Sequence, residues 1–416
     1  RERQHGDRLA RVGRSRVLPI TAVYGANAAG KSTLVDGLEA LSGIVLESRR
    51  AGAMLPVAPH LPEGRDEPTA FAVEIVVSAV GADDDAVDRV FYYELAADRI
   101  RRELLAQVKA RTEELLFERD KDDVTLYGEL DGDERARAHA MVVAPNETLL
   151  GALGAEGAGA VGAVWDWFAR RLNIIHPESM YMHLLARINA DAVFSRAMSS
   201  GLTRADTGIS EVRLEEMKME ALPVGADQLT GLLEALREKG GTFVIDVVGA
   251  DQTILSLTDE GEPTARRLVT VHEREDGPAP EQHSSFTLPL QEESDGTQRF
   301  MNLLPILFQL RDKNSRSVFV VDELENSMHP KLTEDFISSF LEGLGADDRC
   351  QLIFTTHEIQ LMRSDLLRRD EIWMVDKIDG QSRLTRVSDF ADIGVRKDAD
   401  LLSFYMSGRL GGVPRI

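Results

Sequence analysis

The segment Gly25–Ser32 reads Gly-Ala-Asn-Ala-Ala-Gly-Lys-Ser and matches the pattern of a phosphate-binding loop. An apolar, partly β-branched run at residues 18–24 precedes it, and Leu34, Leu38 and Leu41 follow it at helical spacing. A strand before the loop and a helix after it are the context that this motif requires. The chain is therefore expected to have an α/β fold in which this loop joins a buried strand to a helix.

The residue types in this loop suit the binding of nucleotide phosphates. Gly25 and Gly30 allow backbone conformations that turn successive N–H groups toward one anion, and the next helix adds the positive end of its dipole. We expect Lys31 to reach the β- and γ-phosphates and the Ser32 hydroxyl to ligate Mg²⁺. The nucleotide-binding residues expected here are Gly25, Asn27, Gly30, Lys31, Ser32 and Thr33. ATP is favoured over GTP because the chain has no guanine-recognising Asn-Lys-x-Asp motif.

A second candidate lies far downstream, where the apolar run Val318–Val321 ends in Asp322 and Glu323. Such a run is typical of a buried parallel strand, and α/β sheets place ligand chemistry at the carboxyl ends of their strands. We expect Asp322 to hold Mg²⁺ through water and Glu323 to deprotonate the attacking water. Taken alone, these residues also suit a core strand that runs into a solvated acidic turn, but the phosphate loop upstream favours the catalytic interpretation.

Leu352–Thr356 predicts another buried strand, which ends at His357. A histidine there can hydrogen-bond the γ-phosphate and the attacking water, although a lone histidine in a turn is the commoner outcome. The spacing from the acidic pair leaves room for one strand and one helix, which we expect at Asp335–Leu344. His357 is thus the second catalytic candidate, after Glu323.

Ser294–Arg299 precedes a helical pattern of apolar residues. Ser294 or Asp295 is a suitable N-cap, and Gly296 exposes backbone N–H groups, so this helix start could form a second anion site. An ordinary capped helix fits the same residues at least as well. Pro305 lies inside this helix and is expected to bend it or to remove one hydrogen bond.

Together these segments resemble the ABC-type ATPase heads, and most closely the predicted ATP-binding proteins related to the SMC-like and OLD (overcoming lysogenization defect) families, many of them in bacterial antiphage loci. The segments that carry the resemblance are Gly25–Thr33, Glu293–Arg299, Val318–Pro330, Thr355–His357 and Phe404–Pro414. The resemblance implies a P-loop ATPase head with a mixed sheet and an inserted helical arm or lid. It also implies a dimer around two ATP molecules, in which Ser294 and Gly296 contact the γ-phosphate bound by the other subunit. His357 would be the switch histidine and Glu325–His329 the loop between the two sites.

The sequence departs from a standard transporter head at two places. Asp295-Gly296-Thr297 replaces a Gly-Gly-Gln core, and no convincing glutamine marks the Q-loop, because Gln107 is the only glutamine between the phosphate loop and residue 227.

The long spacing from Lys31 to Asp322 indicates a large insertion. We expect an N-terminal ATPase lobe with a β-rich subdomain at 1–145, a mainly helical arm or lid at 146–240, and a C-terminal ATPase lobe at 241–416. Residues 179–240 lack sustained heptads, which argues for a short arm rather than a long coiled coil.

Within these parts, residues 100–117 allow two interpretations. Their apolar spacing suits a helix, whereas the family resemblance favours a hairpin, and we predict strands. Gly151–Ala163 is expected to be a loop or linker, and a helix is expected from Trp165 to Leu172. The other expected strands are Phe71–Val77, Val90–Leu95, Val124–Tyr127, Thr242–Val248, Thr253–Leu257, Trp373–Val375 and Leu384–Val387.

The net charge of −22 argues against broad binding of duplex DNA, which needs a basic footprint, and suits a basic protein partner. Six arginines near the start indicate a flexible, solvated leader or, less well supported, a functional patch. No long apolar run predicts a membrane span, so a cytoplasmic protein is expected. The single cysteine, Cys350, excludes an intramolecular disulfide. His176 and His183 lack the cysteine or carboxylate neighbours of a zinc site, so we expect no structural metal.

Two classes of function fit these features. The first is a sensor ATPase that regulates a separate nuclease or toxin effector in antiphage defence, and the second is an SMC-like ATPase of DNA maintenance that acts directly on nucleic acid. The acidic balance and the short arm favour the first. A nucleotide-gated scaffold with negligible turnover is a third option, against which Glu323 and His357 argue. The chain starts at Arg1, so we expect a short native start to be missing. From the position of its end we expect no TOPRIM nuclease of the kind that OLD-type relatives carry.

Overall fold

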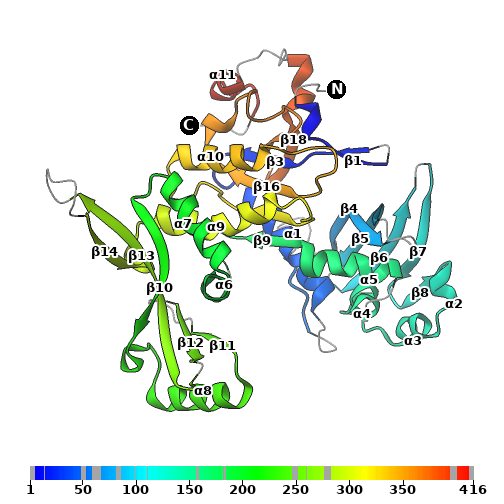
Figure 1. Cartoon of the computed structure of the whole chain (residues 1–416). Coiled ribbons are helices and arrows are strands. Elements are labelled where there is room, and N and C mark those ends of the chain that lie inside the picture. The colour runs from blue at the N-terminus through cyan, green and yellow to red at the C-terminus, as the bar shows by residue number, and fades with distance from the viewer. Residues whose placement is uncertain are drawn as a thin grey trace. The chain divides into compact units, whose positions relative to one another are not determined.

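The computed structural model describes residues 5–13, 15–47, 53–58, 67–80, 86–97, 99–109, 111–155, 159–179, 181, 184–245, 252–258, 260–275, 283–393 and 401–411. The chain forms two compact units (Figure 1). The first unit comprises Arg1–His176, Asp312–Leu324 and Leu341–Ile416, and the second comprises Pro177–Arg311 and Glu325–Phe340. The boundary at 176/177 lies well beyond the expected boundary near residue 146.

A six-stranded sheet carries the sequence motifs of the first unit. Its strands, in spatial order, are β18 (Gln381–Arg386), β17 (Ile372–Ile378), β3 (Ile20–Gly25), β16 (Gln351–Thr356), β15 (Val318–Val321) and β9 (Leu172–Ile175). All neighbours are parallel except β17 and β18, so the expected mixed sheet is confirmed. All four residues of β15 are buried, as its continuous apolar run predicts.

The parallel strands of this sheet end level with one another. The pairs at this edge are Val375 with Gly25, Thr356 with Tyr24, Val321 with Phe354, and Val321 with Ile175. The phosphate loop begins at the last residue of β3 and leads into α1 (Lys31–Leu46). Asp322, His357 and His176 each directly follow a strand at this same edge.

The second sheet of the first unit is antiparallel. Its strands, in order, are β4 (Thr69–Val80), β5 (Ala86–Ala97), β6 (Ile100–Val108), β7 (Glu113–Asp120) and β8 (Asp123–Leu126). The choice of strands for residues 100–117 is therefore confirmed. Phe91, Tyr93 and Phe117 on this sheet form one buried core with Leu41 and Ile44 of α1. This core gives α1, and so the phosphate loop at its start, a fixed support.

Two helices in this unit correct the expected linker at Gly151–Ala163. Residues 151–154 belong to α4 (Leu149–Gly154), and residues 159–163 belong to α5 (Gly159–Asp166). The small residues allow close packing rather than flexibility, because a Cβ on Gly154 would stand 2.3 Å from the Cβ of Trp165. The helix expected at Trp165–Leu172 is confirmed except at its ends: it begins earlier, as α5, and continues as a π-helical turn, η2 (Trp167–Arg171), which leads into β9 at Leu172.

The arginine-rich start is ordered from residue 6 where it is described, which corrects the expected flexible leader. A short hairpin pairs β1 (Ala10–Val12) with β2 (Ser15–Val17), and Leu9, Ala10 and Val12 are buried. The Arg8 guanidinium donates a hydrogen bond to the Leu366 carbonyl. Arg1, Arg3 and Arg14 lie outside the described residues.

The second unit is built on the antiparallel sheet β10 (Ile209–Met217), β13 (Pro263–Glu275), β12 (Thr253–Leu257) and β11 (Thr242–Ile245), with β14 (His283–Pro289) also paired to β13. The expected hairpin of β11 and β12 is confirmed, but residues 246–251 lie outside the description. The mainly helical expectation for residues 179–240 is wrong at β10. Its apolar residues Ile209, Val212 and Met217 fit a helical spacing, and pairing with β13 over most of its length decides for a strand.

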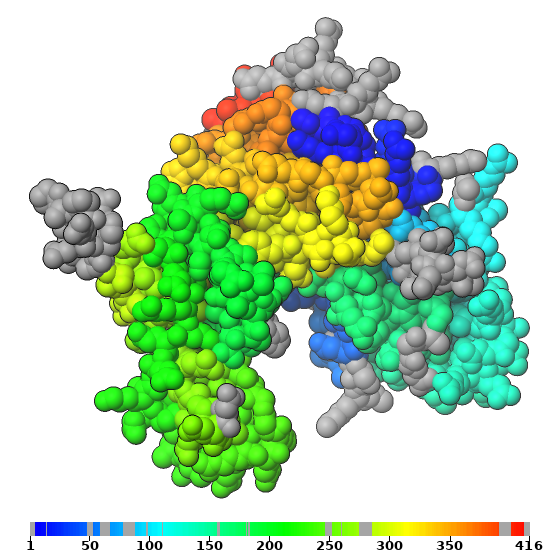
Figure 2. Space-filling model, in the orientation of Figure 1, coloured from blue at the N-terminus to red at the C-terminus, as the bar shows by residue number. Residues whose placement is uncertain are grey.

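Residues 218–262, here called the distal lobe, lie between β10 and β13 along the chain. They contain β11, β12 and α8 (Ala226–Lys239), whose buried residues, among them Leu236 and Leu255, form a separate small core. Figures 1 and 2 show this lobe in green, joined to the rest of its unit through β10 and β13. The other helices of the second unit are α6 (Leu184–Ala190), α7 (Ala192–Arg204), α9 (Asp295–Arg311) and α10 (Pro330–Leu341), the last of which begins before the expected Asp335.

The remaining elements are short. They are η1 (Gly6–Arg8), α2 (Glu129–Gly132), α3 (Glu134–Val142), η3 (Met219–Ala221), η4 (Leu290–Glu292), η5 (Ile359–Leu361), η6 (Val387–Ile393) and α11 (Leu401–Met406). Among the helices in the described ranges, none combines the length and the apolar character needed to cross a bilayer.

Candidate functional site

The phosphate loop is shaped by close contacts as well as by its glycines. Gly30 has φ +109° and Ala28 has φ +61°, so two residues of the loop adopt the left-handed region. A Cβ on Gly25 would stand 2.7 Å from the Val375 carbonyl oxygen, and one on Gly30 would collide with Ser382. Gly25 is therefore required by the close approach of β17, and Gly30 both by the approach of Ser382 on β18 and by its own backbone conformation.

Lys31 folds back across the mouth of this loop. Its side chain is only 6% exposed, and its ammonium group donates to the Gly25 carbonyl at 3.1 Å. The same Nζ lies 2.9 Å from Nε2 of His357, at the end of β16. Two residues that sequence analysis placed in one site are thus in direct contact.

The acidic pair is held by a residue that sequence analysis missed. The buried Thr355 hydroxyl donates to Oδ1 of Asp322 at 2.5 Å and accepts from the Glu323 backbone N–H at 2.8 Å. Glu323 itself has φ +46°, a conformation that is uncommon for a residue with a side chain. The backbone conformation of Glu323 and the hydrogen bond to its N–H fix the position from which its side chain extends. The sequence offered one indication of this role, because Thr355 lies two residues before His357, near the end of the same predicted strand.

These residues fit a magnesium nucleotide. The exposed Ser32 lies in the first turn of α1, and the buried Asp322 directly follows β15 at the same edge of the sheet. A hydroxyl and a carboxylate are oxygen ligands of the type that Mg²⁺ prefers. The N–H groups at the start of α1 and the Lys31 ammonium add the positive charge that phosphates require.

Ser294 and Gly296 belong to the second unit, at the start of α9. Ser294 is the N-cap, because its hydroxyl accepts from the Thr297 N–H at 3.2 Å and its carbonyl accepts from the Gln298 N–H at 3.0 Å. A Cβ on Gly296 would stand 2.5 Å from the Ser327 carbonyl oxygen, so only glycine permits this approach. The segment expected to lie between two nucleotide sites thus packs against the expected signature.

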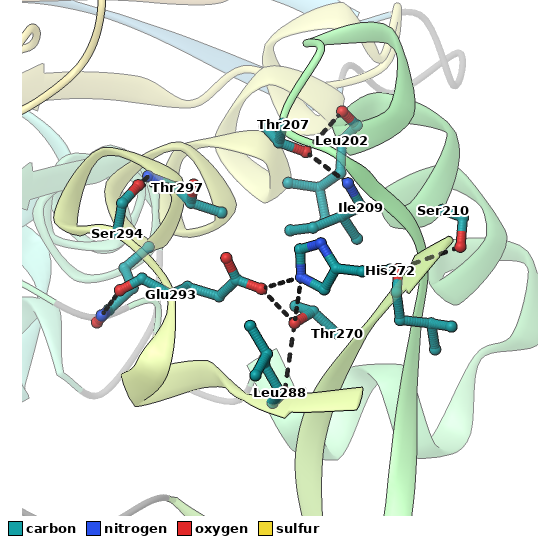
Figure 3. A network of polar contacts seen from close by, with 12 residues as sticks. Leu202, Thr207, Ile209, Ser210, Thr270, His272, Leu288, Glu293, Ser294 and Thr297 are labelled. Atoms are coloured by element: carbon teal, nitrogen blue, oxygen red, sulfur yellow. Dashed lines mark hydrogen bonds and ion pairs between the residues drawn. The ribbon is translucent and has the colours of Figure 1, made fainter. Parts of the chain in front are cut away.

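Glu293, directly before this N-cap, is a second residue whose role sequence analysis missed. Its carboxylate accepts hydrogen bonds from the Thr270 hydroxyl and from Nε2 of His272, the latter at 2.6 Å (Figure 3). Both partners lie on β13, which was not among the expected strands, so no local pattern could have found them.

The statement that His176 lacks carboxylate neighbours is corrected by the structure. Nε2 of His176 lies 3.1 Å from Glu39, and potential ligand atoms of Asp36, Glu39 and His176 all lie within 4.8 Å of one another. The neighbours come from α1, more than a hundred positions earlier, so sequence spacing could not show them. Gln107 lies in β6 of the antiparallel sheet, away from the strand ends that carry the motifs. His183 lies outside the described residues.

Comparison with known proteins identifies the family of the chain. A search of curated proteins gives no match. Among solved structures, the chain is similar to the one titled "Crystal structure of the SmcHead bound to the C-winged helix domain of ScpA", with 14% identity and a TM-score of 0.37 over 91% of this chain and 95% of that chain. The family described as "AAA domain, putative AbiEii toxin, Type IV TA system" matches residues 20–363. Because this match covers most of the sequence, from β3 to beyond His357, the chain belongs to that AAA-domain family.

Proposed function

We propose that the chain is an ATPase of the ABC/SMC-like type that binds ATP with Mg²⁺ at Gly25–Thr33. The observation that carries the proposal is that Lys31, Asp322 and His357, from three distant segments, lie at one edge of one sheet. Family membership supports ATP binding and hydrolysis as the activity.

Each residue of this site has a proposed task. The Lys31 ammonium and the N–H groups of the loop bind the phosphates, while Ser32 and Asp322 hold Mg²⁺, which neutralises phosphate charge when bound. Glu323 accepts a proton from the attacking water, and His357 orients that water and the γ-phosphate. The Thr355 hydrogen bonds hold the acidic pair in position for this step.

We further propose that two chains dimerise around ATP. Ser294 and Gly296 would then bind the γ-phosphate held by the partner chain, with N–H groups at the start of α9 as donors. The close packing of Gly296 on Ser327 supports this arrangement, because it fixes the start of α9 against the segment that follows Glu323.

The proposed biological role is regulation of a separate nuclease or toxin in antiphage defence, as in OLD-related systems. The family description names a toxin of a toxin–antitoxin system, and the net charge of −22 suits the docking of a basic, nucleic-acid-cutting partner. ATP-driven closure of the dimer would be the two-state element, and the effector would bind one state more tightly.

Phosphate release by the purified chain with ATP and Mg²⁺ tests the activity, and Glu323→Gln tests the mechanism. The variant should bind ATP, hydrolyse it about 10²–10⁴-fold more slowly, and elute as a dimer when ATP is present. Proteins that co-purify from the native locus with and without ATP test the regulatory role. Hydrolysis by Glu323→Gln at the wild-type rate would exclude Glu323 as the base.

One observation favours the alternative, a DNA-maintenance ATPase that acts directly on nucleic acid. A pocket of about 740 Å³ in the first unit is lined by Arg89, Arg170, Arg171 and Arg316 together with Trp165 and Trp167. Guanidinium and indole groups are those that bind phosphates and stack on bases. ATP-dependent binding of single-stranded DNA that is lost in Arg171→Ala, with no protein co-purifying, would make this alternative the better account.

A further inference from the structure

A buried polar cluster ties strand β13 to the residue before the expected signature serine. Thr270 and His272 point to the same side of β13, and both hydrogen-bond the same carboxylate oxygen of Glu293 (Figure 3). The side chains of Glu293 and His272 are only 7% and 14% exposed, and Thr270 is fully buried. Such shielded hydrogen bonds to a carboxylate are stronger than those in water.

The backbone of Glu293 is held as firmly as its side chain. Its carbonyl accepts a hydrogen bond from the Gln298 side chain at 2.8 Å, and its N–H donates to the Leu290 carbonyl at 3.1 Å. The next residue, Ser294, caps α9. Any displacement of Glu293 is therefore passed directly to the N-cap and to the N–H groups of the first turn.

The histidine of this cluster is fixed in turn by an aromatic stack. The ring of His272 lies nearly parallel to that of Phe286 on β14, with centroids 5.2 Å apart. His272 and Phe286 are also paired residues in the register of β13 and β14. The imidazole thus has little freedom to turn away from Glu293.

Strand β13 extends from this cluster into the distal lobe. Its first residues, Pro263–Arg267, pair with β12 of the lobe, and Val269–Glu275 pair with β14. On its other edge, β13 pairs with β10 from Ala265 to His272. The lobe is joined to the rest of its unit through the paired strands β10 and β13. A displacement of the lobe therefore acts on this two-stranded ribbon, whose far end contains Thr270 and His272.

We propose that Glu293 is a positioning residue that couples the distal lobe to the expected signature, Glu293–Arg299, so that the packing of the lobe sets the rate of ATP hydrolysis through the position of Ser294. The proposal rests on the proposed function, in which Ser294 serves the nucleotide of the partner chain. The carboxylate touches no substrate; it transmits the position of β13 to the start of α9.

Glu293→Ala removes the link, and Glu292→Ala, an exposed glutamate one position earlier, is the matched control. Glu293→Ala should bind ATP normally but lower kcat by about 10-fold, within the range typical of coupling between sites. Hydrogen exchange should quicken at residues 294–299 and stay unchanged in the phosphate loop. Thr270→Val should reproduce part of the loss, and Thr270→Ser, which keeps the hydroxyl, should not.

A double-mutant cycle tests the connection to the lobe. Leu236→Ala opens the core of the distal lobe, where Leu236 is fully buried, and should change kcat in the wild type and in Glu292→Ala but not in Glu293→Ala. Equal effects of Leu236→Ala in all three backgrounds, or a wild-type kcat in Glu293→Ala, would overturn the coupling. Unchanged turnover in Ser294→Arg would instead contradict the proposed function of Ser294 itself. That outcome is distinguishable from a failure of the coupling, in which Ser294→Arg stops turnover and Glu293→Ala does not change it.

Discussion

The Lys31 ammonium lies 2.9 Å from Nε2 of His357, although 326 positions separate the two residues. The contact joins the cation of the phosphate loop to the histidine that ends β16, and both face the place that the γ-phosphate of ATP would occupy in the proposed site. Lys31 also donates to the Gly25 carbonyl, so its charge is held by polar atoms for which a phosphate is the stronger partner.

Lys31→Ala should abolish tight ATP binding, because it removes the cation from a loop that otherwise offers only N–H groups. Hydrogen bonds to charged groups contribute about 1.5–3 kcal/mol, so affinity should fall by at least about tenfold. His357→Ala should leave affinity almost unchanged and lower kcat. Equilibrium binding of labelled ATP to both variants measures this. Wild-type affinity in Lys31→Ala would refute the assignment of the nucleotide site.

Thr355→Val should slow hydrolysis without weakening ATP binding. The substitution keeps the shape of the side chain but leaves the Asp322 oxygen and the Glu323 N–H without the Thr355 hydroxyl. Unmet hydrogen bonds of this kind cost about 1–3 kcal/mol, and here the cost falls on the proposed catalytic pair, Asp322 and Glu323. Thr355→Ser, which keeps the hydroxyl, is the control and should retain activity. Equal kcat in both variants would show that Thr355 does not position the pair.

The sequence predicted those parts of the site in which one short segment contains all the residues that identify it. The loop Gly25–Ser32, the acids after β15 and the histidine after β16 each follow a short apolar run, and the structure brings them to one edge of the sheet. Contacts that join distant segments could not be predicted. Thr270 and His272 meet Glu293 only because β13 pairs as it does, and His176 meets Glu39 only through the packing of α1 near β9.

The wrong predictions of secondary structure also arose from local sequence patterns. In β10 the apolar residues suit both a helix and a strand, and the long pairing with β13 decides between them. Strand β9 was not among the expected strands, because a run of four residues carries no clear period. At Gly151–Ala163, glycine was taken as a sign of flexibility where it permits two helices to touch.

Gly154→Ala should therefore destabilise the first unit. The added Cβ would stand 2.3 Å from the Cβ of Trp165, which neither helix can accommodate without moving. Overpacking of this kind typically costs about 1–3 kcal/mol. Gly132→Ala, where nothing lies within 4 Å of the added atom, is the control. Urea unfolding followed by tryptophan fluorescence compares the two, and a Gly154→Ala midpoint equal to that of the control would contradict the close packing.

Glu371 should make the stability of the first unit depend on pH. It is fully buried directly before β17, and burial raises the pKa of its carboxyl to about 7, against hydrogen bonding and attraction from Arg368. The folded state thus keeps the proton between about pH 4.5 and 7, where the unfolded chain has lost it. The contribution of Glu371 to stability therefore falls as the pH rises through this window.

Glu371→Gln removes this titration and keeps an oxygen to accept the Arg368 N–H. Relative to wild type, the variant should gain stability between pH 5 and pH 8, by about 2–3 kcal/mol at most. Glu342→Gln, at an exposed position, is the control for the loss of one negative charge. Urea midpoints at the two pH values measure the effect, and a constant difference between Glu371→Gln and wild type would rule out a raised pKa.

Ser294→Arg should leave ATP binding nearly intact and still stop turnover, because Ser294 is proposed to act on the nucleotide of the partner chain. The added side chain would fill the start of α9, where the Ser294 hydroxyl now hydrogen-bonds the backbone N–H and the hydroxyl of Thr297. Each Ser294→Arg chain keeps a complete phosphate loop, and each Lys31→Ala chain keeps a complete signature. A mixed dimer therefore contains one composite site that is whole and one that carries both defects.

Random mixing in equal amounts makes half of all dimers mixed, so activity should rise well above that of either variant alone and should increase with protein concentration. Glu292→Ala mixed with Lys31→Ala is the control; it also contains Glu292→Ala dimers with two whole sites, so it sets the upper limit of the activity expected. Mixtures of Ser294→Arg and Lys31→Ala that never exceed the separate variants would contradict a site shared between two chains.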